Sequence, residues 1–208
     1  MSKILEWDEQ LFLWMNSFHT PCLDPVMLLM TKTAFWIPLY LVLLYLIFAH
    51  YKKEGWLILA GIGLAILLSD QITTTLMKPF FARPRPSHEP GLQGLVHIVN
   101  GYEGGLYGFA SGHAANTLAT AVLIWLIFRK LTRWTALIFV WAAFMMYTRI
   151  YLGVHYPGDI LAGMLVGLMG GWIGFRFYRW LKSIRDKRLS ATHDRGICFP
   201  QIAQIHAE

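Results

Sequence analysis

Five long apolar stretches constrain the fold of this chain more than any other feature of its sequence. They cover residues 34–50, 56–77, 113–128, 134–151 and 158–181. A helix rises about 1.5 Å per residue, so about 20 helical residues cross the hydrocarbon core of a bilayer. The stretches are continuous and do not alternate with polar residues, which argues against membrane-spanning strands. We therefore predict an all-α, polytopic membrane bundle of about five transmembrane helices.

The composition supports a lipid environment. Hydrophobic residues make up 56% of the chain and charged residues only 14%, whereas soluble domains carry about 25% charged residues. A soluble all-α protein with a very large core is the alternative, but so few charges cannot cover it in water. The net charge of +6 does not indicate nucleic acid, because the basic residues lie at the ends of apolar stretches and not on a polar face.

The chain is short enough for one domain, which we place at residues 1–188, with a flexible tail at 189–208. Apolar residues recur at helical spacing along one side of residues 4–18, which predicts an amphipathic helix lying in the membrane interface. Residues 23–33 either extend the first span or form a separate helix, and the sequence leaves this open. The two cysteines, Cys22 and Cys198, have neither metal-ligand spacing nor a disulfide framework.

The distribution of basic residues predicts the orientation. With five crossings, the 51–55 loop, the 129–133 loop and the segment after residue 181 lie on one side. This side, with the end of the last stretch, holds twelve of the eighteen basic residues. The positive-inside rule makes it cytoplasmic. The 78–112 connection and the 152–157 turn then lie on the opposite, non-cytoplasmic face.

Several charged residues on the non-cytoplasmic face require an explanation, because charge near hydrocarbon is costly and tends to mark function. Arginine offers planar pairs of donors that match phosphate oxygens, and lysine acts as a point charge. Ser111 and Gly112 lie where a helix should begin, so backbone N–H groups and the helix dipole favour an anion there. We interpret the following segments as one phosphate site: residues 78–86, 110–113 and 148–159.

The same segments carry groups suited to phosphoryl transfer. A nucleophilic histidine needs a neutral ring and a partner that orients it. His155 and Asp159 are four residues apart, with Pro157 as a plausible first helical residue, so the carboxylate could hold the ring in one tautomer. His113 could then protonate the departing oxygen as a general acid.

These residues resemble the type 2 phosphatidic acid phosphatases, a family of membrane lipid phosphatases related to the vanadium-dependent haloperoxidases. The family signature reads Lys-x6-Arg-Pro, then Pro-Ser-Gly-His, then Ser-Arg-x5-His-x3-Asp. The resemblance covers roughly residues 56–181, with Ala110 in place of the proline and Thr148 in place of the first serine of the third part. The matching residues are Lys78, Arg85, Pro86, Ser111, Gly112, His113, Arg149, His155 and Asp159.

The resemblance implies a reaction through a phosphohistidine intermediate, with no metal and no organic cofactor. It implies that His155 is the nucleophile, that Asp159 orients it and that His113 is the general acid. The remaining residues implied to cradle the phosphate are Lys78, Arg85, Ser111, Gly112 and Arg149.

The substrate is inferred by analogy alone. We expect a lipid phosphate or diphosphate on the non-cytoplasmic face of a bacterial inner membrane, with undecaprenyl diphosphate first. The alternatives are a lipid A phosphatase and a phosphatidylglycerophosphate or phosphatidic acid phosphatase. A membrane transporter using the same cations is a remote alternative, because no internal repeat is visible and a carrier would not need two histidines beside a carboxylate. The oligomeric state is left open.

Four features outside the signature have competing interpretations. Arg83 could contact lipid headgroups, which we favour, or bind the phosphate. His88 and His97 invite a metal hypothesis, but their spacing matches no ligand pattern and a solvated loop is favoured. Asp70 should face the catalytic cavity, either paired with a cation or hydrogen-bonded within the bundle. The glycines of the last stretch should allow close helix packing; they are Gly163, Gly167, Gly170, Gly171 and Gly174.

Overall fold

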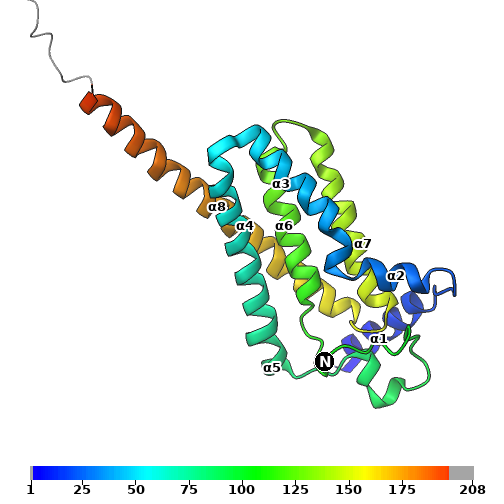
Figure 1. Ribbon diagram of the computed structural model, residues 1–208. Coiled ribbons are helices and arrows are strands. Elements are labelled where there is room, and N and C mark those ends of the chain that lie inside the picture. Colours follow the sequence, from blue (N-terminus) through cyan, green and yellow to red (C-terminus); the bar gives the residue numbers. More distant parts are fainter. Residues whose placement is uncertain (1, 197–208) are drawn as a thin grey trace, which may run out of the picture.

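The protein is a bundle of helices in a computed structural model that describes the backbone of residues 2–196 and the side chains of residues 3–191 (Figure 1). Within this part of the chain the structure contains helices and no strands, so the all-α prediction is confirmed. The α-helices are α1 (Ser2–Asn16), α2 (Asp24–Met30), α3 (Ile37–Tyr51), α4 (Gly55–Asp70), α5 (Lys78–Phe81), α6 (Gly112–Phe128), α7 (Leu137–Tyr151) and α8 (Pro157–Gly196).

The five apolar stretches correspond to helices α3, α4, α6, α7 and α8. Two helical stretches, Thr33–Phe81 and Pro157–Ala191, are long and apolar enough to cross a membrane by length and composition, and Gly112–Phe128 is a shorter apolar helix. The stretch Thr33–Phe81 is divided into two helices, α3 and α4 (Figure 1). The chain reverses its direction between them, near Lys52, where φ is 47°. The count of five spans stays a prediction.

Helix α6 lies at the centre of the bundle, and α8 packs closely against it through glycine. A Cβ atom built on Gly167 would lie 2.5 Å from the carbonyl oxygen of Ala115, and one on Gly171 would lie 2.6 Å from that of Ala119. Gly174 makes the same approach to α4, with its Cβ position 2.5 Å from the oxygen of Gly61. The prediction that these glycines allow close packing is confirmed.

Replacement of Gly167 by alanine should therefore separate α8 from α6. We expect the free energy of unfolding in detergent to fall by about 1–3 kcal/mol, the usual effect of overpacking. Gly63 on α4 is the matched control, because a Cβ atom there meets nothing within 4 Å. Equal thermal stability of Gly167→Ala and Gly63→Ala would contradict this account of the interface.

The end of α4 carries polar residues toward the start of α6. The chain continues from Asp70 through a π-helical segment, Gln71–Met77, into α5. A Cβ atom on Gly112 would lie 3.3 Å from Thr73 Oγ1 and 3.9 Å from Asp70 Oδ1. The polar end of the second apolar stretch thus packs against the turn that begins α6. The sequence predicted that Asp70 faces this side of the bundle.

The N-terminal residues form a helix that is anchored to the bundle. Helix α1 exposes several large apolar side chains, including Trp7 and Trp14, but Phe12 and Asn16 are buried. The amide of Asn16 donates hydrogen bonds to the carbonyl oxygens of Ile150 (3.1 Å) and Tyr151 (2.9 Å) at the end of α7. Helix α1 is therefore more than an amphipathic surface helix, because it holds the end of α7.

The structure shows a helix in residues 23–33, which the sequence left open, and in the first part of the expected tail. Residues 23–33 contain the separate helix α2, followed by a short 3-10 turn at Thr33–Trp36. Residues 189–196 of the expected tail continue helix α8. Residues 197–208, with Cys198, lie outside the described residues, so the proposed domain boundary stays a prediction.

Candidate active site

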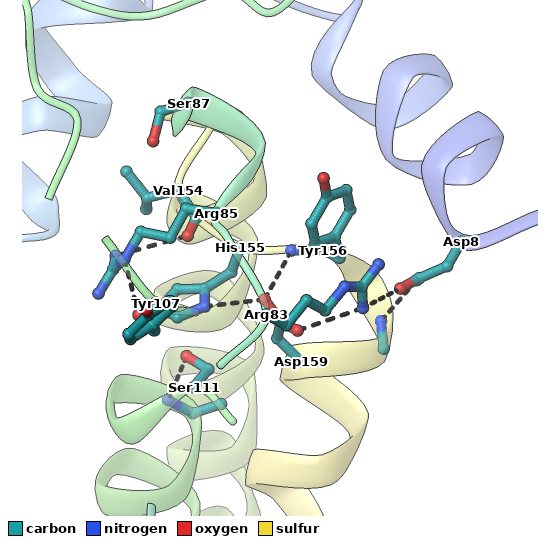
Figure 2. A network of polar contacts seen from close by, with 12 residues as sticks. Asp8, Arg83, Arg85, Ser87, Tyr107, Ser111, Val154, His155, Tyr156 and Asp159 are labelled. Carbon is teal, nitrogen blue, oxygen red and sulfur yellow. Dashed lines mark hydrogen bonds and ion pairs between the residues drawn. The ribbon is translucent and has the colours of Figure 1, made fainter. Parts of the chain in front are cut away.

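Three segments far apart in sequence meet in one network of polar contacts (Figure 2). The backbone N–H of Ser111, at the start of α6, donates to the carbonyl oxygen of Asp159 in α8 at 3.0 Å. Arg85 in the 82–111 connection donates from Nη1 to the carbonyl oxygen of Val154 at 3.4 Å. Its Nε donates to the carbonyl oxygen of Tyr107 at 3.2 Å. These bonds join the segments that the sequence analysis assigned to one site.

His155 and Asp159 form a buried pair. His155 Nδ1 lies 3.2 Å from Asp159 Oδ2, and the two side chains are 2% and 0% exposed. The backbone N–H of Tyr156 donates to the same oxygen at 3.1 Å. An ionised carboxylate only accepts hydrogen bonds, so Nδ1 of His155 carries the proton. The other ring nitrogen, Nε2, then bears the lone pair that a nucleophile requires.

The remaining cations surround this ring. Burial first, and then the charges of Arg149, Arg85 and Lys78, hold the pKa of His155 well below its ordinary value. The ring of His113 interacts electrostatically with the same three cations and with His155. The structure therefore brings the second predicted histidine and all three predicted cations around the first histidine.

Arg149 is held in a way that leaves donor capacity free. Its Nη1 donates to Thr31 Oγ1 at 2.6 Å and to the hydroxyl of Tyr102 at 3.0 Å. Its Nε is buried and has no hydrogen-bond partner among the described side chains. Buried polar atoms in proteins are rarely left unpaired. An anion in front of the guanidinium would supply the missing acceptor.

Ser111 and Gly112 occupy the turn where α6 begins. Ser111 is the N-cap, and its hydroxyl oxygen accepts from the backbone N–H of Ala114 at 3.4 Å. This arrangement leaves the first N–H groups of α6 at the face that carries the His155–Asp159 pair. All eight residues that the sequence assigned to the site thus lie in one region of the structure, while their roles remain proposals.

Arg83 makes contacts that neither of its two sequence interpretations anticipated, and its roles toward lipid headgroups or phosphate stay predictions. Its Nη1 lies 2.7 Å from Asp8 Oδ2 and 3.4 Å from Asp159 Oδ1, and its guanidinium lies 3.8 Å above the ring of Tyr156 (Figure 2). Asp8 Oδ1 also accepts from the backbone N–H of Gly158 at 2.7 Å. Helix α1 is thereby tied to the N-terminus of α8, where a negative charge is favourable.

Loss of this link should slow catalysis without weakening binding. In Asp8→Ala, the longer contact with Asp159 is the remaining ion pair of Arg83 among the described residues, and the guanidinium can move further onto this carboxylate. We expect kcat to fall about tenfold and KM to change less than twofold, as for an interaction that acts in the transition state. The control is Glu6→Ala on the exposed side of α1. An equal loss of activity in the two variants would contradict the assignment.

Gly108 is a site residue that no motif indicates. A Cβ atom on it would lie 2.8 Å from Asp159 Oδ2 and 3.6 Å from His155 Nδ1. Gly104 is similar, because it has φ +71° and its Cβ position lies 2.7 Å from Arg85 Nη1. Gly108 lets the 82–111 connection approach the His155–Asp159 pair closely, and Gly104 lets it approach Arg85.

The histidines of that connection do not gather metal ligands. His97 Nε2 lies 2.9 Å from Asp24 Oδ1, and its ring stacks on that of His19 at 3.7 Å. His88 Nε2 lies 3.4 Å from the carbonyl oxygen of Gly104. In the part of the chain whose side chains are described, there is no group of three or more His, Cys, Asp or Glu placed to hold a metal ion. His97 instead helps to fix the connection against α2.

The chain is similar to known proteins in both sequence and fold. Residues 54–183 match the family model of the PAP2 superfamily. A crystal structure of Aquifex aeolicus LpxE is similar with a TM-score of 0.61 and 27% identity, over 80% of this chain and 93% of that chain.

Three relatives are named for lipid substrates. The lipid A 4'-phosphatase of Bacteroides thetaiotaomicron is 40% identical, over 80% of this chain and 74% of the relative. The lipid A 4'-phosphatase of Porphyromonas gingivalis is 39% identical, over 88% and 78%. The undecaprenyl-diphosphatase BcrC of Bacillus subtilis is 28% identical, over 82% of each chain.

Proposed function

Because the chain belongs to the PAP2 superfamily and is a membrane lipid phosphatase, we propose that its substrate is lipid A, from which it removes the 4'-phosphate. The sequence alone put undecaprenyl diphosphate first and a lipid A phosphatase second. The relatives favour the second reading, since two lipid A 4'-phosphatases share 40% and 39% identity with this chain against 28% for BcrC.

The observation that carries the mechanism is the buried hydrogen bond between His155 Nδ1 and Asp159. It leaves Nε2 of His155 free to attack the phosphorus atom. The bond between phosphorus and the sugar oxygen breaks as the bond to Nε2 forms, and Asp159 stabilises the resulting cationic ring. The phosphoryl oxygens gain negative charge near the side chains of Lys78, Arg85, Ser111 and Arg149, and near the N–H group of Gly112 at the start of α6.

His113 supplies the proton that the departing sugar oxygen needs. In the second half of the reaction the same ring accepts a proton from water, which attacks the phosphohistidine. Inorganic phosphate leaves and His155 returns to its neutral state. Two histidines are needed because one forms the covalent bond and the other moves the proton.

We also propose that the protein is multi-pass in a bacterial inner membrane, with its site on the periplasmic face. The basic 51–55 and 129–133 turns lie at the end of the bundle opposite the 78–112 connection (Figure 1). The positive-inside rule assigns that basic end to the cytoplasm. The site would then face the leaflet in which lipid A phosphates are exposed to the periplasm.

The low pKa of His155 has a consequence for the pH dependence. The pKa is lowered from 6.5, so the ring is neutral and nucleophilic throughout the neutral range. We expect kcat/KM to stay constant as the pH falls through 6.5 and to decrease only well below that pH, where the ring becomes protonated. An acid limb with its midpoint at or above 6.5 would contradict the assignment of His155 as the titrating nucleophile.

The substrate proposal is tested by assaying the purified protein in detergent on lipid A and on undecaprenyl diphosphate. We expect kcat/KM to be at least about tenfold higher for lipid A, which corresponds to about 1.4 kcal/mol in the transition state. Mass spectrometry should show loss of the 4'-phosphate and retention of the phosphate at position 1. A preference for undecaprenyl diphosphate would overturn the lipid A assignment, and release of no phosphate from either would favour a carrier.

A further inference from the structure

Two hydroxyl groups hold the guanidinium of Arg149 at one of its nitrogen atoms. Nη1 of an arginine carries two N–H groups. In Arg149 this atom donates to Thr31 Oγ1 at 2.6 Å and to the hydroxyl of Tyr102 at 3.0 Å. Because both donors of Nη1 are occupied, a phosphate has to bind through the rest of the guanidinium. The two hydroxyls thus decide which part of Arg149 meets the substrate.

The hydroxyl of Thr31 is itself fixed by a chain of hydrogen bonds. Thr148 Oγ1 lies 2.7 Å from the carbonyl oxygen of Met145 and 3.3 Å from Thr31 Oγ1. A carbonyl oxygen only accepts and a hydroxyl has one proton, so the shorter contact takes the proton of Thr148. The proton of Thr31 is then left to point at Thr148 Oγ1. The oxygen of Thr31 therefore acts as an acceptor toward Arg149, in a bond that the cationic charge strengthens.

The packing of helix α2 places Thr31 beside the site. Thr31 is buried at the end of α2, and its backbone N–H donates to the carbonyl oxygen of Met27 at 3.0 Å. Met27 is buried in one apolar cluster with Leu152 and Val154, from the turn that leads to His155. The apolar contacts of α2 therefore fix where the Thr31 hydroxyl lies relative to the catalytic turn.

Tyr102 reaches Arg149 from a different segment, the 82–111 connection. Its backbone N–H donates to the carbonyl oxygen of Val99 at 2.9 Å, and Cζ of Arg149 lies 5.5 Å from the centroid of its ring. Thr31 and Tyr102 are 118 and 47 residues away from Arg149 in sequence. The tertiary fold thus brings two separate elements onto the same nitrogen atom.

We propose that Thr31 and Tyr102 are positioning residues for phosphoryl transfer, which fix Arg149 in the orientation that receives the phosphate. The inference rests on the proposed function, through the role of Arg149 as a phosphate ligand. A misplacement of about 1 Å in a group that positions the substrate can cost about 10²-fold in rate. Thr31 lies outside residues 54–183, which match the family model, so the matched region does not contain this contact.

The first test removes each hydroxyl alone, with an activated aryl phosphate as substrate and the protein in detergent. Thr31→Val and Tyr102→Phe each keep the shape of the side chain and take one acceptor from Nη1 of Arg149. We expect kcat/KM to fall about tenfold in each variant, because the guanidinium is no longer held in place. The inhibition constant of orthovanadate should rise by the same factor, since this anion copies the geometry of the transition state.

Two further variants separate the loss of the hydroxyl from a general loss of packing. Thr31→Ser keeps the hydroxyl and should retain kcat/KM within about threefold of the native value, as is usual for a small change that preserves the hydrogen bond. Thr120→Val is the matched control, because its hydroxyl donates to the carbonyl oxygen of Asn116 at 2.9 Å within one helix. This control should stay within about twofold of the native value. Thermal unfolding in detergent is measured for every variant.

The second test asks whether the two hydroxyls act through Arg149. Arg149→Met removes the guanidinium and keeps an unbranched side chain, and it should lower kcat/KM by about 10²-fold or more. In this background Thr31→Val should change kcat/KM by less than about twofold, because the effects of residues that act through a shared partner do not add. The same is expected of Tyr102→Phe.

The outcomes separate this inference from the proposed function. Native values of kcat/KM in both Thr31→Val and Tyr102→Phe would overturn the inference, and so would a tenfold loss that persists in the Arg149→Met background. Either result leaves the proposed function standing. An Arg149→Met protein with native activity would instead overturn the role of Arg149 in the phosphate cradle, on which the proposed function depends.

Discussion

Replacement of His155 by alanine should reduce turnover by roughly ten-thousand-fold or more, the loss found when a catalytic nucleophile is removed. The ring of His155 lies 3.2 Å from Asp159, which orients it. Burial and the charges of Arg149, Arg85 and Lys78 lower its pKa and so keep the ring neutral. Alanine at this position removes the nitrogen that would attack phosphorus. The measurement is kcat for phosphate release in detergent, with thermal unfolding measured beside it.

The control for this variant is His88→Ala. His88 lies in the 82–111 connection, and its ring contacts the carbonyl oxygen of Gly104 at 3.4 Å. We expect this variant to keep its activity within about twofold of the native value, as is usual for a change away from the reacting groups. A folded His155→Ala protein with more than a few per cent of native turnover would exclude this residue as the nucleophile.

Replacement of His113 by alanine should have an effect that depends on the leaving group. A sugar alkoxide needs a proton as it departs, so turnover of lipid A should fall about 10²- to 10⁴-fold. An activated aryl phosphate departs without that proton, so formation of the phosphoenzyme should fall less than tenfold. The measurement is a pre-steady-state burst with each substrate.

The same variant should also slow the second half-reaction, because no base then activates the attacking water. The aryl phosphate should therefore give a burst of phenol followed by slow turnover. An equal loss of burst rate with both substrates would show that His113 positions the phosphate and does not transfer a proton.

The sequence predicted the parts of the site that depend on local spacing. His155 and Asp159 are four residues apart, and Ser111 and Gly112 begin a helix, so each pair is brought together by its own segment. The cations followed from the cost of placing charge beside hydrocarbon. The apolar stretches likewise predicted the five long helices, because their lengths and continuity are local properties.

The remaining contacts depend on the tertiary fold and could not be predicted. Asp8 and Arg83 meet across 75 residues of sequence, and the acidic character of residues 6–9 gives no sign of that contact. Gly108 shows its importance only when α8 is seen behind it.

The lipid substrate was the least predictable feature, for a related reason. The signature residues contact the phosphate, which undecaprenyl diphosphate and lipid A share. We expect side chains outside the signature to distinguish the lipids, and these lie along helices whose apolar character suits any lipid chain. Here the relatives, at 40% and 39% identity, changed the order of the two candidates.

The most direct test of this account is to identify the phosphorylated residue. His113→Ala protein is mixed with an activated aryl phosphate, quenched within the burst and digested under alkaline conditions, in which phosphohistidine is stable. Mass spectrometry should find one phosphoryl group, on the peptide that contains His155, and acid should remove it. A phosphoryl group on any other residue, or rapid burst chemistry with no phosphopeptide, would contradict covalent catalysis by His155.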